Sequence, residues 1–108
     1  MTYETAVRAW EELSDSKQSA LKEQLVRAAV AYARVRTDWR LVSREGRLNM
    51  DPRRTALHEA FIDACNILSR AMATAGESAE WRKRLGDDRT VIGDFACLLH
   101  AHLGIQAR

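Results

Sequence analysis

The chain has 108 residues, of which 46% are hydrophobic and 30% charged, with five glycines and one proline. This composition excludes a disordered chain, a collagen-like chain and a membrane-spanning segment, and it predicts one domain over residues 1–108. The net charge of +2 is too small to indicate nucleic-acid binding by itself. Composition therefore bounds the fold class but assigns no function.

Helical periodicity begins near the N-terminus and continues through the chain. The first predicted helix covers residues 2–13, and Ser14-Asp15-Ser16 predicts a break followed by an N-cap. The second covers residues 17–43 and repeats apolar residues at heptad spacing: Leu21, Leu25, Ala28, Tyr32, Val35, Trp39 and Val42. A shorter apolar stripe lies on another face. A helix that is apolar on two faces contacts more than one neighbour, so this helix is expected at the centre.

The third predicted helix starts at Asp51-Pro52, with Asp51 as N-cap and Pro52 in the first turn, after a connection over residues 44–50. Its apolar residues also follow a heptad: Leu57, Phe61, Ala64, Leu68, Ala71 and Ala75. Gly76 follows and favours a left-handed end. Two heptad helices joined by a short connection predict a long antiparallel hairpin.

Two further helices complete the predicted fold. Ser78 is expected to cap a short helix over residues 79–85, which Gly86 ends, and Asp87 or Asp88 to cap a last helix that runs to about residue 103. Gly93 inside that helix indicates a close helix–helix contact. The sequence thus predicts an all-α compact bundle of four main helices plus one short helix, built on the hairpin.

Basic residues gather in one part of the chain. Residues 34–54 hold seven arginines and three acidic residues, a local net charge of +4, whereas residues 1–33 and 55–108 are each at −1. In a hairpin these arginines would lie near one tip, where guanidinium groups suit phosphate or carboxylate ligands. The candidate binding residues are Arg36, Arg40, Arg44, Arg47, Arg53 and Arg54. The expected partner is a nucleic acid or an acidic protein surface.

An Arg-x4-His spacing runs from Arg53 to His58. This stretch resembles the signature of HEPN-type helical ribonucleases, in which an Arg and a His from paired subunits cleave RNA without a metal. It departs from that signature at Arg54, where the family usually has Asn, Asp or His, and in opening a helix early in the chain. On a regular helix Arg53 and His58 lie ~140° apart, while Arg54 and His58 share a face.

Other chemical motifs are incomplete. The possible zinc ligands are Cys97, His100 and His102, with Cys65. They lack the second closely spaced ligand pair that structural zinc requires, so no metal and no cofactor is expected. Two cysteines form no disulfide framework, and the first residues lack the apolar core of a signal peptide. We therefore expect a cytoplasmic protein that does not engage a membrane.

Three functional hypotheses follow. The first is a small non-enzymatic binding or adaptor protein that uses the arginine-rich hairpin tip. The second is a metal-independent ribonuclease that uses Arg53 or Arg54 with His58. The third is a structural homo-oligomer, because the apolar helix faces are extensive for 108 residues and favour a homodimer through the hairpin or the last helix.

Overall fold

The computed structural model describes residues 1–107, of which 84% are helical and none is in a strand. The helices are α1 (Tyr3–Ser14), α2 (Ser19–Leu41), α3 (Arg44–Thr74), α4 (Glu80–Leu85) and α5 (Arg89–Gln106). The predicted all-α bundle of four main helices and one short helix is confirmed.

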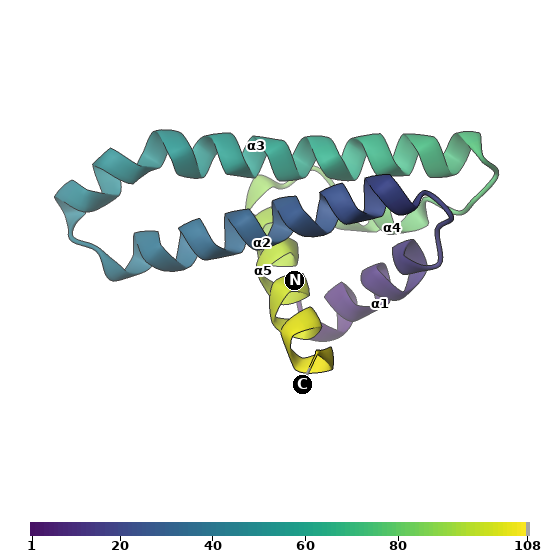
Figure 1. Ribbon diagram of the computed structural model, residues 1–108, viewed down its shortest axis with the longest axis horizontal. Coiled ribbons are helices and arrows are strands. Elements are labelled where there is room, and N and C mark those ends of the chain that lie inside the picture. Colours follow the sequence, from purple (N-terminus) through teal and green to yellow (C-terminus); the bar gives the residue numbers. More distant parts are fainter. Residues whose placement is uncertain (108) are drawn as a thin grey trace.

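The fold is organised around an antiparallel hairpin of α2 and α3 (Figure 1). At ~1.5 Å per residue, the 31 residues of α3 extend about 46 Å, which accounts for the longest molecular dimension of 47 Å. In Figure 1, α5 crosses the middle of the hairpin steeply, and α1 lies beside α5. Helix α2 packs against both α3 and α5, so its two apolar faces have the two neighbours that the sequence predicts.

The core lies where the hairpin meets the other three helices. Leu25, Phe61, Leu68, Trp81 and Phe95, one or more from each of α2 to α5, are fully buried. The rings of Phe61 and Phe95 are 5.9 Å apart at an interplanar angle of 47°, a tilted contact that joins α3 to α5. The part of the hairpin to the left of α5 in Figure 1 is a two-helix arm that no other helix of the described chain covers.

Helix α3 begins eight residues earlier than the sequence predicts. Residues 44–50 are helical, and the N-cap is Ser43, whose hydroxyl accepts from the Gly46 N–H at 3.2 Å. Pro52 is therefore inside the helix, where it removes one backbone N–H donor. Pro52 is exposed, so water can hydrogen-bond to the backbone carbonyl that would otherwise accept from the missing N–H. Asp51, predicted as the N-cap, instead accepts from the Trp39 indole N–H at 2.8 Å.

The glycines after α3 and α4 and the Asp88 cap agree with the sequence, whereas α2 ends at Leu41 rather than Ser43 and α5 continues through Gly104 to Gln106. Gly76 adopts a φ of +79°, the left-handed conformation expected after α3, and Gly86, which is expected to end α4, has a φ of +70°. Asp88 caps α5, accepting from the N–H groups of its first turn. Ser78 is not the N-cap of α4: its hydroxyl donates to Glu12 at 2.9 Å, and the same Glu12 oxygen accepts from the Trp81 N–H at 3.0 Å. A side chain from α1 thus supplies the cap.

The turn between α1 and α2 is also held by a distant acid. Helix α2 starts at Ser19 rather than Lys17 and has no side-chain N-cap. The Ser16 hydroxyl accepts from the Gln18 N–H at 3.1 Å and donates to Glu77 at 2.7 Å, and Glu77 also accepts from the Lys17 N–H at 2.8 Å. The α1–α2 turn is therefore fixed to the α3–α4 turn.

Candidate anion-binding site

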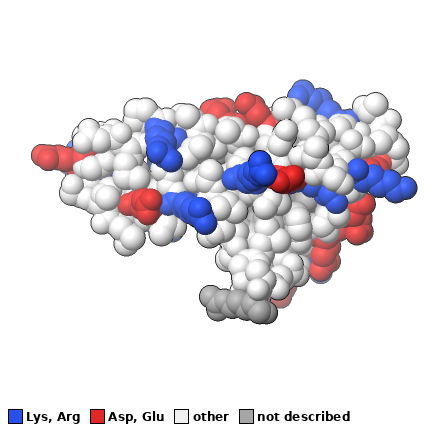
Figure 2. All heavy atoms as spheres, viewed as in Figure 1, with Lys and Arg blue, Asp and Glu red and all other residues white. Residues whose placement is uncertain are grey.

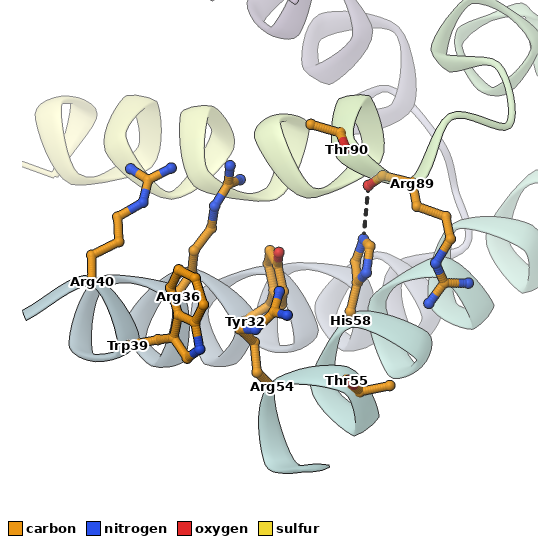
Figure 3. A pocket seen from close by; sticks show the side chains of 9 residues that line it. All are labelled: Tyr32, Arg36, Trp39, Arg40, Arg54, Thr55, His58, Arg89 and Thr90. Carbon is orange, nitrogen blue, oxygen red and sulfur yellow. Dashed lines mark hydrogen bonds between the residues drawn. The ribbon is translucent and has the colours of Figure 1, made fainter. Parts of the chain in front are cut away.

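A recess of about 360 Å³ lies where α2, α3 and α5 meet, and Figure 3 shows the side chains that line it. Four arginines contribute to its walls: Arg36 and Arg40 from α2, Arg54 from α3, and Arg89 from the start of α5. Within residues 1–107 no carboxylate belongs to this lining. The recess therefore concentrates positive charge in a concave space, which favours an anion.

Carboxylates outside the recess pair with most of these arginines. The pairs are Arg36–Asp94 at 2.9 Å, Arg54–Asp51 at 3.6 Å, and Arg89–Glu59. The separation of 3.6 Å between Arg54 Nε and Asp51 is longer than a hydrogen bond, and that Nε is buried without a hydrogen-bond partner. Arg40 has no ion pair, and its side chain makes no hydrogen bond to any residue in 1–107. Arg40 and Arg54 therefore keep most of their donors available.

His58 and Tyr32 form the floor of the recess. The His58 Nε2 lies 2.9 Å from the Arg89 carbonyl oxygen, and because a carbonyl only accepts, Nε2 carries the hydrogen. The two rings stack at 4.8 Å with an interplanar angle of 23°. Burial lowers the pKa of His58 below its usual 6.5, and the charges of Arg89 and Arg54 lower it further. These effects favour the neutral form of the imidazole.

A glycine lets α5 approach this floor. A Cβ added to Gly93 would lie 3.0 Å from the Tyr32 hydroxyl oxygen and 3.4 Å from His58 Nε2. The close contact that the sequence predicts at Gly93 is confirmed. It places the first turn of α5, with Arg89 and Thr90, at the edge of the recess (Figure 3).

Trp39 forms one wall and is itself enclosed by arginines. The guanidinium carbons of Arg47 and Arg54 lie 4.5 Å and 4.9 Å from its ring centroid. Arg47 also donates to the backbone carbonyls of Trp39 at 3.0 Å and Arg40 at 3.1 Å, so it caps the C-terminal end of α2. Arg47 is thus a structural residue of the hairpin.

The structure separates the six predicted binding arginines into two groups. Arg36, Arg40 and Arg54 line the recess. Arg44 lies at the exposed start of α3, Arg47 caps α2, and Arg53 lines a different hollow with Arg34 and Asp38. Sequence reasoning did not select Arg89, which lies far from the basic segment along the chain. Its only local signal is its position directly after the Asp88 cap.

The ribonuclease hypothesis depends on where the structure places Arg53, Arg54 and His58. Arg53 does not share a cavity with His58, whereas Arg54 does. His58 is the one lining side chain that titrates near neutral pH, but it is only 9% exposed and its Nε2 donates to the protein backbone. Within the described residues, no three His, Cys, Asp or Glu side chains are grouped as a metal site requires. The chemistry of the lining is that of anion binding.

Comparisons of the chain with protein-family models, with curated proteins and with solved structures found no match. Of the helices within residues 1–107, none has both the length and the apolar character needed to cross a membrane.

Proposed function

We propose that the protein is a non-enzymatic binding protein that holds single-stranded nucleic acid by its phosphates in the recess between α2, α3 and α5. The observation that carries this proposal is the convergence of four arginines from three helices on one cavity without a lining carboxylate. Guanidinium groups bind phosphate with paired, charge-assisted hydrogen bonds. Arg40 supports the proposal most strongly, because within residues 1–107 no acid neutralises it.

One face of the molecule carries charges of both signs. Figure 2 shows Lys and Arg interspersed with Asp and Glu over one face of the molecule. That face offers no continuous basic track for a duplex and no uniformly basic surface for an acidic protein. A flexible single strand can instead insert one or two phosphates into a concave site. Neutralising one or two phosphates predicts a slope of about −0.7 to −1.4 in log K against log salt concentration.

The test is a titration of a labelled single-stranded oligonucleotide followed by fluorescence anisotropy. Arg40→Gln removes charge-assisted hydrogen bonds worth ~1.5–3 kcal/mol, so affinity should fall at least about tenfold. Arg53→Gln is the matched control: it changes the net charge equally on the neighbouring helix but lies outside the recess. Equal losses in both variants would mean that charge alone drives binding, and no binding to the unaltered protein would refute the proposal.

The ribonuclease hypothesis has one observation in its favour, because Arg54 and His58 share the recess. It predicts metal-independent cleavage of RNA in the presence of a chelator. Replacing His58 with alanine would abolish that cleavage by removing a contribution of ~10²–10⁴-fold in rate, while leaving binding nearly intact. Binding without cleavage in the same assay would support the non-enzymatic proposal.

The homo-oligomer hypothesis is supported by exposed apolar residues at the hairpin tip. Leu41 is 80% exposed and Leu48 is 64% exposed, on the arm that no other helix covers. Light scattering after size exclusion tests it, and a mass of one chain at all concentrations would refute it.

A further inference from the structure

Several donors of the recess have no partner within residues 1–107. They are the guanidinium nitrogens of Arg40 and the terminal nitrogens of Arg54, together with the hydroxyls of Thr55 and Thr90, all of which line the cavity. The backbone N–H groups in the first turn of α5 are not among them, because the Asp88 carboxylate already accepts from Thr90 and Val91 at 2.8 Å and 3.2 Å. The available contacts from α5 are thus the Thr90 hydroxyl and the Arg89 guanidinium nitrogens other than the one paired with Glu59.

These donors come from three helices and line one cavity. Arg40 projects from α2, Arg54 and Thr55 from α3, and Thr90 from the start of α5 (Figure 3). The floor is closed by the stacked rings of Tyr32, 3% exposed, and His58. A ligand that uses donors from all three helices must present acceptor oxygens in several directions.

The two most available charges also suit a doubly charged group. Arg40 has no acid partner in the described chain, and the contact of Arg54 with Asp51, at 3.6 Å, is longer than a hydrogen bond. The Nε of Arg54 is buried and also lacks a hydrogen-bond partner. A phosphomonoester carries a charge of about −1.5 to −2 at pH 7 and three strong acceptor oxygens. An internal phosphodiester carries a single negative charge and has only two terminal oxygens.

We infer that the recess recognises a terminal phosphate, that is, a phosphomonoester dianion, rather than the internal phosphodiesters of a strand. This inference rests on the proposed function, because it specifies which phosphate the same cavity holds. Two sources share this chemistry: the phosphorylated end of a nucleic-acid strand and a free mononucleotide. In either case Arg40 and Arg54 neutralise the charge, and the hydroxyls of Thr55 and Thr90 donate to the remaining oxygens.

The experiment compares one labelled single strand in three forms, with a 5′-phosphate, with a 3′-phosphate and with hydroxyls at both ends. At least one phosphorylated form should bind about tenfold more tightly than the hydroxyl form. Thr90→Val removes a hydroxyl without changing charge or branching, so it should weaken binding of the phosphorylated form more than binding of the hydroxyl form and thereby reduce this preference. Arg53→Gln, outside the recess, should leave the preference intact.

The outcomes separate the inference from the proposed function. Equal binding of all three forms would overturn the inference and leave nucleic-acid binding standing, whereas no binding of any form would overturn both. A preference that persists unchanged in Thr90→Val and in Arg54→Gln would also overturn the inference, because the cavity would not be its source. Competition with adenosine monophosphate then distinguishes the two sources. Displacement at matching concentrations supports the free mononucleotide, and displacement only at much higher concentrations supports the strand end.

Discussion

Replacing Gly93 with alanine tests the close approach of α5 to the floor of the recess. The added Cβ would lie 3.0 Å from the Tyr32 hydroxyl oxygen and 3.2 Å from its Cε2, whereas ordinary contact begins at 3.4 Å. Tyr32 is 3% exposed and stacked on His58, so the ring cannot turn outward and the helices must separate by a few tenths of an ångström. Overpacking of this kind costs about 1–3 kcal/mol.

The helix-forming gain of alanine over glycine, about 1 kcal/mol, partly offsets that cost. Gly93→Ala should therefore lower the free energy of unfolding by up to about 2 kcal/mol. Gly104→Ala is the control, because it lies in the same helix and its Cβ would meet no atom within 4 Å; it should stabilise the protein. Thermal unfolding followed by circular dichroism measures both, at about 4–8 °C per kcal/mol for a domain of this size. Equal stabilisation by the two alanines would refute the predicted contact at Gly93.

Three further predictions concern the core and the titratable groups. Leu68→Ala should lose about 2–5 kcal/mol of stability in urea, because the side chain is fully buried and its removal leaves a cavity; an unchanged midpoint would place Leu68 outside the core. Burial raises the pKa of Cys65 to about 12, so a thiol reagent at mildly alkaline pH should modify Cys97 in the folded protein and Cys65 only on unfolding. Equal rates of modification of the two cysteines in the folded protein would contradict this. Burial lowers the pKa of His58 below 6.5 in the folded state, so the unfolded chain binds the proton first as the pH falls. The free energy of unfolding should therefore decrease as the pH drops through 6.5, and this decrease should be smaller in His58→Gln.

The hairpin could be predicted from the sequence because its determinants are local. The apolar heptads of α2 and α3 require only a helix and an adjacent partner, and the buried Leu25, Tyr32, Phe61 and Leu68 lie on those seams. The start of α3 could not be predicted, because Asp51-Pro52 is also a favourable helix start. Ser43 supplies an earlier cap, and the Trp39 indole engages Asp51 across the hairpin. That second contact depends on tertiary structure.

The candidate site was only partly predictable, for a similar reason. The spacing of Arg54 and His58 places them on one face of α3, and the structure confirms that they share a cavity. The contribution of Arg89 depends on the angle at which α5 crosses α2, and Gly93 was the only sequence signal for that crossing. Nor does a run of arginines distinguish a binding residue such as Arg40 from Arg47, whose donors cap the backbone of α2.

The most direct test of the phosphate-binding account is to identify the residues whose NMR signals shift when a phosphate-bearing ligand binds. A single-stranded oligonucleotide with a terminal phosphate, titrated into ¹⁵N-labelled protein, should shift the backbone amides of Thr55, Thr90 and Gly93 and the side-chain Nε–H signals of Arg40 and Arg54, while that of Arg53 remains unchanged. Shifts confined to the hairpin tip around residues 41–48, or no shifts at concentrations that saturate an ordinary phosphate site, would contradict the account.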